Sequence, residues 1–359
     1  MSQWAVKIML SLSVTAMLAG ALLTGCADKK GAAGPGPGPT GTEQNAPGQG
    51  QANNANGSEN AGGSGGGNGG GSDGGNGAAA ASGSEQNRIL EQFERLQAGQ
   101  SEAKDYLAFF DEHLAALPQD DADRLMQKLL AFYGEDLLKT QDKFAEEAVL
   151  QALGELGWPI LDEQLKQIKD AAVRQTVLGA LAGGYKLETA EGMVFPVVDY
   201  GALKKYNPAL SEKMQDFIAL LALDSDAKMA SDGGLVITWD ELAKRAAAAE
   251  QYFTRYAGTP EAEQAKKLFY TRYLTTYLYG LDNTPIFDFD TFKLTDEVKA
   301  SYEHTVKTYP GTKTAAAVQG FLNVLKSTDW QVFTKEKGMQ TDIPAVKQYR
   351  DRVLAGDAD

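Results

Sequence analysis

A sharp change in composition near residue 84 decides which part of this chain can fold. From Ala27 to about Gly83 the sequence is dominated by Gly, Asn, Ser, Gln and Pro, and it offers almost no apolar side chain for burial. Such a segment cannot offset the entropy that ordering costs. We therefore expect residues 26–83 to be a disordered tether with a mean reach of roughly 40 Å.

Helical periodicity begins after Ser84 and continues almost to the carboxyl terminus. Ile89 and Phe93 lie four residues apart, and later apolar residues repeat this helical spacing. Short connections between helices favour antiparallel neighbours. We predict a mainly all-α fold of antiparallel helical hairpins or an α-solenoid-like array. An N-terminal helical unit is expected at 84–185 and a C-terminal helical unit at 186–359.

Breaks in the periodicity mark helix ends and two irregular stretches. A separate helix is predicted from about residue 135 to residue 156. Residues 186–206 contain Gly192 and Pro196 within apolar and partly β-branched sequence, which excludes a helix interior. We expect a buried connection or a short edge strand there, or alternatively the lining of a groove. The second irregular stretch, residues 280–290, is aromatic and acidic.

An internal echo in the last third of the chain indicates stacked helical hairpins. Residues 256–262 (YAGTPEA) recur as residues 309–315 (YPGTKTA), displaced by 309 − 256 = 53 positions. In both copies an aromatic residue can end one helix, Gly permits the turn, and Thr can cap the next helix. The joint resembles the helix–turn–helix joint of tetratricopeptide-type solenoids. The resemblance covers seven residues per copy and lacks the Trp and Leu-Gly signature of that family.

The amino terminus has the features of a secretory signal. Lys7 supplies a positive charge, and Ile8 begins an apolar run that extends to Leu23. This run of about 16 residues is shorter than the roughly 20 that span a bilayer, so a retained transmembrane helix is the less economical alternative. Residues 23–26 (LTGC) resemble the lipobox of bacterial lipoproteins. The resemblance implies removal of residues 1–25, lipidation of Cys26, and an anchor in the cell membrane on its extracytoplasmic face.

Cysteine content and charge narrow the classes of fold and partner. Cys26 is the only cysteine, so the exported part has no intramolecular disulfide and no thiolate metal site. The formal net charge of −14 repels nucleic acid and anionic lipid headgroups. Expected partners are therefore the membrane, through the lipid on Cys26, and an envelope protein, peptide or glycan.

The histidines give no indication of metal or nucleophilic catalysis. His113 and His304 are the only two, and each stands in an amphipathic segment without a second His or Cys nearby. The spacing that zinc or iron sites require is absent, and no serine has the context of a nucleophile elbow. We predict no metal site and no cofactor.

Carboxylates in breaks between helices are the remaining candidates for chemistry. A pair held roughly 5–10 Å apart hydrolyses glycosidic bonds when one acts as acid and the other as nucleophile or base. Alternatively, these residues bind calcium, although none matches the EF-hand loop, or they cap turns by local hydrogen bonds. The candidates are Asp224, Asp226, Asp232, Asp282, Asp288 and Asp290.

Aromatic residues crowd the segment before the acidic loop. Tyr270, Tyr273 and Tyr277 follow helical spacing, and Phe287 lies in the loop that follows. Such a stripe packs in a core between hairpins, or it forms a ligand face that stacks sugars or clamps a peptide. Both interpretations stay open from the sequence.

The sequence favours binding or scaffolding in the cell envelope over catalysis. Helical hairpin arrays offer binding surfaces, and no motif in this chain requires an enzyme. An envelope glycan hydrolase with paired carboxylates is the alternative. An importer-associated solute-binding lipoprotein is disfavoured, because the alternating strand and helix pattern of such proteins is missing. Sporulation, germination, secretion and wall maintenance all fit this location.

Overall fold

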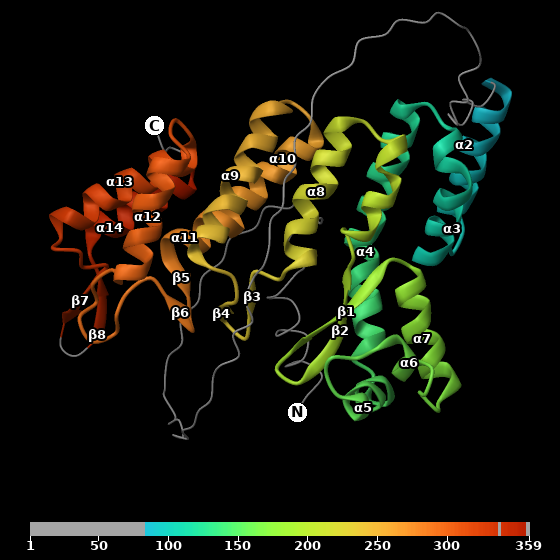
Figure 1. The fold of residues 1–359 in the computed structure, drawn as a ribbon, viewed down its shortest axis with the longest axis horizontal. Coiled ribbons are helices and arrows are strands. Elements are labelled where there is room, and N and C mark those ends of the chain that lie inside the picture. The colour runs from blue at the N-terminus through green and yellow to red at the C-terminus, as the bar shows by residue number, and fades with distance from the viewer. Residues whose placement is uncertain (1–82, 337–338, 357–359) are drawn as a thin grey trace, which may run out of the picture. The chain divides into compact units, whose positions relative to one another are not determined.

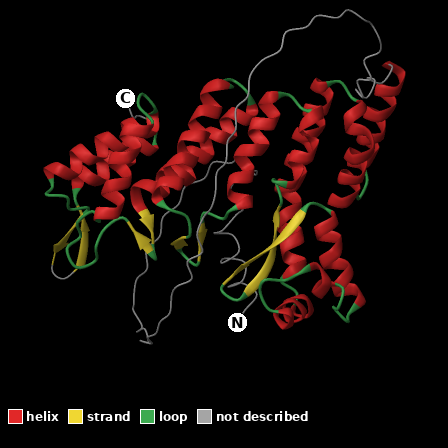
Figure 2. Ribbon diagram, viewed as in Figure 1, coloured by secondary structure: helices red, strands yellow, loops and turns green. Residues whose placement is uncertain are grey.

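The computed structural model describes residues 83–336 and 339–356. They form helices joined by short connections and four two-stranded antiparallel sheets (Figures 1 and 2). The prediction of a mainly all-α array is confirmed. The predicted signal peptide, Cys26 and nearly all of the predicted tether lie outside the described residues. Within the described residues, no helix has the length and the apolar character to cross a membrane.

The first part of the array is helical as predicted, with one wrong boundary. α4 runs unbroken through Gly134, so the separate helix predicted from residue 135 to residue 156 does not exist. Buried Tyr133 and Leu137 flank Gly134 and offset its helix penalty of about 1 kcal/mol. The elements are α2 (Gly83–Ala98), α3 (Ala103–His113), η1 (Leu114–Ala116), α4 (Gln119–Phe144), α5 (Glu147–Leu156), α6 (Asp162–Leu165) and α7 (Ala171–Ala182).

The first irregular stretch forms a β-hairpin up to residue 198, in agreement with the predicted short strand, whereas its last residues, 202–206, belong to the 3-10 helix η2 (Ala202–Ala209) and were wrongly expected to be non-helical. β1 (Tyr185–Ala190) pairs with β2 (Met193–Val198) across a two-residue turn. Most of β2 is buried, and the side-chain amide of Gln141 in α4 donates to the Pro196 carbonyl at 3.1 Å. Proline has no backbone N–H to donate to a neighbouring strand. It is tolerated in β2 because this strand belongs to a sheet of only two strands.

The second part of the array alternates helices with small hairpins. The elements are η2 (Ala202–Ala209), α8 (Glu212–Asp226), β3 (Ala230–Ser231), β4 (Gly234–Leu235), α9 (Trp239–Arg255), α10 (Pro260–Leu268), the π-helical η3 (Phe269–Leu274), α11 (Thr275–Tyr279), β5 (Gly280–Leu281), β6 (Thr284–Pro285), α12 (Asp296–Thr308), α13 (Lys313–Ser327), β7 (Phe333–Glu336), β8 (Met339–Asp342) and α14 (Pro344–Leu354). The helical segments η2 and α8 precede the hairpin β3–β4, and α9, α10, η3 and α11 precede the hairpin β5–β6. Helices α12 and α13 precede the paired strands β7 and β8, and α14 ends the array.

The echoed sequence forms the same joint twice. Thr259 caps α10 by accepting from the Ala262 N–H at 3.2 Å, and Thr312 caps α13 by accepting from the Ala315 N–H at 3.0 Å. The glycine of each joint has a positive φ, +85° in the first copy and +80° in the second. The prediction of stacked helical hairpins at 256–262 and 309–315 is confirmed in both copies.

Two buried carboxylates fix helices that are distant in the sequence. Asp123 in α4 accepts from the Ser211 N–H at 2.9 Å, at the start of α8. Glu250 in α9 accepts from the Thr314 N–H at 2.9 Å, in the first turn of α13. A negative charge at a helix N-terminus is favourable because the free N–H groups and the helix dipole point toward it. These contacts hold neighbouring helices in register.

Candidate binding surface

The turns of successive hairpins touch one another along one edge of the helical array. The Glu191 N–H donates to the Asp232 carboxylate at 3.0 Å, which joins β1–β2 to β3–β4. The Asn283 N–H donates to the Gly233 carbonyl at 2.9 Å, which joins β3–β4 to β5–β6. Figure 1 shows these hairpins at the same edge of the helices. We call the three turns (191–192, 232–233 and 282–283), Val236 and the loop 287–294 the turn row.

Local turn chemistry explains why the hairpins form. Glu191 and Asp232 have φ of +51° and +50°, and Gly192 and Gly233 follow with φ of +75° and +72°. Two successive residues with positive φ form the turn whose twist matches a two-residue hairpin. The Asp-Gly pair of β3–β4 is a sequence signal that could have identified this hairpin, although its strands have only two residues each.

The loop 287–294 adds an aromatic cluster to the turn row. Phe287, only 7% exposed, pairs across the loop with Leu294. Its ring centroid lies 5.3 Å from that of Phe289 and 5.0 Å from that of Phe333 in β7. The Phe289 side chain projects from this cluster and is 62% exposed. Packing of the inner rings therefore holds one aromatic ring at the surface.

Asp288 shapes the loop and stays ionised. Its Oδ1 accepts from the Thr291 N–H and the Thr291 hydroxyl, both at 2.9 Å, and from the Asp290 N–H at 3.2 Å. The hydrogen bonds from Thr291 lower the pKa of Asp288 from its ordinary value. A general acid for glycoside cleavage needs a raised pKa instead. Asp288 suits a turn and a fixed negative charge.

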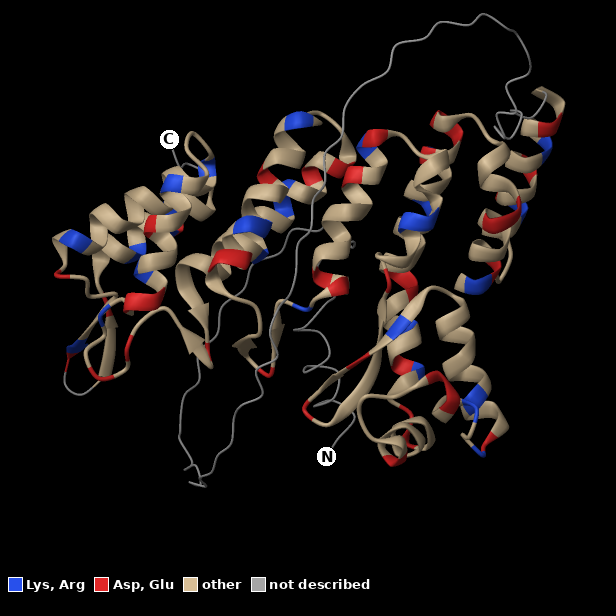
Figure 3. Ribbon diagram, viewed as in Figure 1, with Lys and Arg blue, Asp and Glu red and all other residues tan. Residues whose placement is uncertain are grey.

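Carboxylates exceed cations along the turn row. The lysines next to it are each paired: Lys186 with Asp199 at 4.0 Å, Lys228 with Glu188 at 3.4 Å, and Lys293 with Asp329 at 2.6 Å. Figure 3 shows acidic residues at the hairpin turns. Val236, 52% exposed, provides an apolar side chain beside them. Five exposed acidic residues of the turn row form no ion pair within the described chain: Glu191, Asp232, Asp282, Asp288 and Asp290.

Two of the candidate carboxylates lie away from the turn row, in ion pairs. Asp224 contacts Arg245 Nη1 and Arg272 Nε, each at 2.7 Å, and Arg245 is only 2% exposed. Asp226 pairs with Lys204 at 3.0 Å. Neither arginine could be identified as a partner from the sequence, because the contacts join α8 to α9 and η3 across the fold. Asp224 therefore connects α8 to α9 and η3 through ion pairs.

The tyrosine stripe lies mostly in the core. Tyr273 and Tyr277 are fully buried, and the Tyr277 hydroxyl lies 2.8 Å from the hydroxyls of both Ser301 and Thr305. Burial raises the pKa of Tyr277 to about 12. Tyr270 is partly buried, with its ring edge against Phe269. Two of the three tyrosines thus offer no surface to a ligand. Phe287, the fourth ligand-face candidate, belongs to the turn row but is itself buried, so the exposed ring there is that of Phe289.

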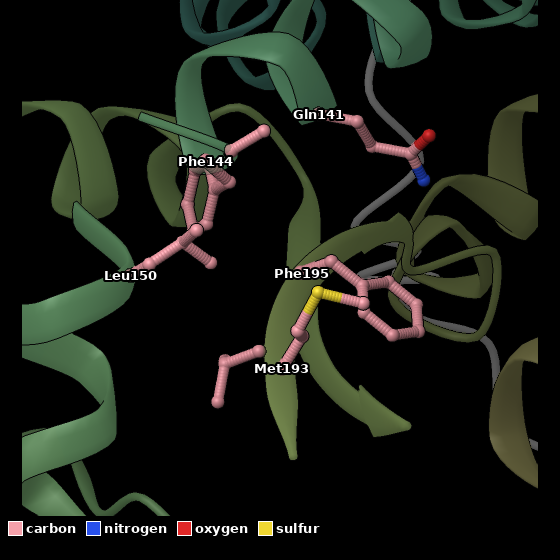
Figure 4. Close-up of a pocket in the computed structure, with 7 residues that line it drawn as sticks. Gln141, Phe144, Leu150, Met193 and Phe195 are labelled. Carbon is pink, nitrogen blue, oxygen red and sulfur yellow. The ribbon is translucent and has the colours of Figure 1, made fainter. Parts of the chain in front are cut away.

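A small apolar pocket lies between α4, α5 and β2. Phe144, Leu150, Met193 and Phe195 line it together with Gln141 (Figure 4). Its cavity volume is only about 10 Å³. This is below the roughly 300 Å³ at which small-molecule sites begin. No group of three or more His, Cys, Asp or Glu side chains that could hold a metal ion occurs in the described part of the chain.

Comparison with known proteins assigns no family. No family model, no curated protein and no solved structure matches this chain. Its function is therefore inferred from the amino-terminal sequence and from the turn row.

Proposed function

We propose that this chain is a bacterial lipoprotein anchored at the extracytoplasmic face of the cell membrane, whose helical domain binds a partner protein through the turn row. The main support is one observation. Three linked hairpin turns and the loop that follows them present five carboxylates that form no ion pair among the described residues, together with two exposed apolar side chains. Such a surface suits a basic partner segment that also has apolar side chains.

The amino-terminal sequence supports the location. A cationic start, a short apolar run and the lipobox-like LTGC at residues 23–26 occur in the order of a lipoprotein signal. Acylation by two or more chains gives a stable anchor, because burial contributes about 0.8 kcal/mol per CH₂ group. The Gly-rich sequence that follows would allow the helical domain to reach partners at a distance from the membrane.

The chemistry around Phe289 supports a basic partner. Its exposed ring stands between Asp288 and Asp290 in the sequence, so a cation above the ring also meets carboxylates. A Lys or Arg side chain gains about 0.5–2 kcal/mol from such a ring face, and the nearby carboxylates add to this attraction. Val236 can contact an apolar side chain of the same segment.

The rigidity of the surface also supports binding. Hydrogen bonds between the hairpins, and the inner rings around Phe287, fix the turn row before any partner arrives. A preformed surface loses less entropy on association than a flexible one. The glycan hydrolase alternative has less support, because Asp288 is held ionised by its turn and Asp224 and Asp226 are in ion pairs.

Capture of a partner and release of wall fragments distinguish these functions. The full chain, extracted in detergent, should retain one stoichiometric protein partner, and the Phe289→Ser variant should lose it. The same protein incubated with purified cell wall should release no soluble muropeptides. Muropeptides that appear with the wild type and vanish with Asp290→Asn would favour the hydrolase and contradict the binding proposal. Gln319→Ser, at an exposed position of α13, is the matched control for capture.

A further inference from the structure

A buried arginine close to the end of the array lacks acceptors for two of its donor atoms. Arg350 in α14 is 1% exposed, and its Nε and Nη1 atoms are enclosed without a hydrogen-bond partner among the described residues. Three rings surround its guanidinium: the centroids of Tyr279, Phe333 and Phe321 lie 4.0, 5.4 and 5.9 Å from Cζ. Ring faces attract the cation, but they do not satisfy the in-plane N–H groups.

Asp342 and Asp351 favour the charged form of this guanidinium, but no carboxylate of the described residues accepts a hydrogen bond from its Nε or Nη1. Asp351 accepts from Lys347 and, at 3.2 Å, from the Tyr279 hydroxyl, so its oxygens are engaged on the outer side of α14. Asp342 is exposed and forms no ion pair with Arg350. Burial lowers the pKa of Arg350 from its ordinary value, although a guanidinium keeps its proton at neutral pH. A full positive charge is therefore enclosed without a contacting anion.

The other buried arginine of the described chain shows how this fold ordinarily satisfies such a group. Arg245 is 2% exposed, and its Nη1 donates to Asp224 at 2.7 Å and to the Ala227 carbonyl at 2.8 Å. Its Nε donates to Glu241 at 3.2 Å. A buried charge that lacks such partners is strongly unfavourable. The comparison indicates that the acceptors of Arg350 come from outside the described chain.

We propose that Arg350, between the rings of Tyr279 and Phe333, forms a binding site for an oxyanion of the carboxylate or phosphate class. The oxyanion accepts hydrogen bonds from Nε or Nη1, and its negative charge replaces the missing counter-ion. This site is distinct from the turn row, because it would bind an anion whereas the turn row would bind cations. It needs no covalent step.

Access to the site requires a local displacement of Phe333. This ring comes from β7, whose side chains are partly or fully exposed, and β7 pairs only with β8 in its sheet. The other two walls, Tyr279 and Phe321, come from α11 and α13 in the body of the array. An anion should therefore reach the guanidinium from the side of β7, where local opening costs the least free energy.

Thermal unfolding of the full chain at constant ionic strength and pH tests this site. Chloride is replaced stepwise by phosphate in one series and by acetate in another, so that the two sources of an oxyanion are separated. We expect a saturable rise in Tm with at least one of them, about 5 °C at an anion concentration one hundred times Kd. Arg350→Met should abolish the saturable rise.

The control is Arg352→Met, which removes the same charge two residues away from an exposed position over Tyr349. It should keep the full response to the anion. If Arg350→Met does not fold, the anion is titrated by calorimetry into the wild type and into Arg350→Lys instead. The lysine variant should bind the anion at least tenfold more weakly than the wild type. Absence of a saturable effect with either anion, or an equal effect in Arg350→Met or Arg350→Lys, would overturn the proposal.

Discussion

Replacing Gly280 by Ala is expected to lower the free energy of unfolding by about 4 kcal/mol. Gly280 has a φ of +78° and a ψ of −165°, a conformation that side chains other than glycine rarely adopt. An added Cβ would lie 2.8 Å from the Ile286 nitrogen and from the Thr284 oxygen, which are backbone atoms that cannot turn away. Urea unfolding of the full chain, followed by far-UV circular dichroism, measures the effect.

Gly311→Ala is the matched control for this substitution. Gly311 also has a positive φ, +80°, but no atom lies within 4 Å of an added Cβ. The expected loss is about 1–2 kcal/mol, from the backbone conformation alone. Equal losses in the two variants would show that the close approach of β5 and β6 does not constrain Gly280. Because Gly280 begins the hairpin of the 282–283 turn, its substitution should also disturb the turn row.

Phe289→Ala is expected to weaken the partner complex by about 2 kcal/mol, which is roughly thirtyfold in Kd. The ring is 62% exposed, so its loss should change the free energy of unfolding little. Asp290→Lys should weaken binding roughly tenfold, with the larger effect at low salt, because an attractive charge becomes repulsive. Titration of the captured partner against each full-chain variant, at two salt concentrations, measures both changes.

Glu303→Lys makes the same change of charge at an exposed position in α12, away from the turn row. It should leave the affinity within about twofold, since a distant exposed charge is screened. If Glu303→Lys weakens binding as much as Asp290→Lys, the partner responds to net charge and the turn row is not its binding surface. Asp288 is left unchanged in these variants, because it shapes the loop through Thr291.

Periodicity and caps predicted the helical part of the fold because they are local signals. The two Tyr-x-Gly-Thr joints placed Thr259 and Thr312 correctly, since a cap depends on residues three positions away. The helix start predicted near residue 135 was wrong, because tertiary burial of Tyr133 and Leu137 overrides the penalty of Gly134. Local propensity therefore predicted these helix ends correctly, but it did not predict that α4 continues as one helix.

The candidate surface was only partly predictable, since it depends on contacts between distant segments. Phe287 and four carboxylates were singled out from the sequence, namely Asp232, Asp282, Asp288 and Asp290. Glu191 was missed, because the hydrogen bonds between hairpins that place it beside Asp232 are not visible in the sequence. Periodicity could not show whether the tyrosine stripe faces a ligand or the core. Tyr277 lies in the core because it packs against α12, where its hydroxyl meets those of Ser301 and Thr305. No sequence signal identified Arg350, because the three rings around its guanidinium come from three separate elements, α11, α13 and β7.

The account depends most directly on the chemistry of Cys26, which would hold the turn row and its partner at the membrane. The decisive measurement is the mass of the amino-terminal peptide of the native protein, isolated from the membrane fraction. We predict that this peptide begins at Cys26 and has the mass of a diacylglyceryl thioether with its fatty acids, and that the Cys26→Ser variant leaves the membrane fraction. A native protein that begins at Met1, with a free thiol at Cys26, would contradict the account.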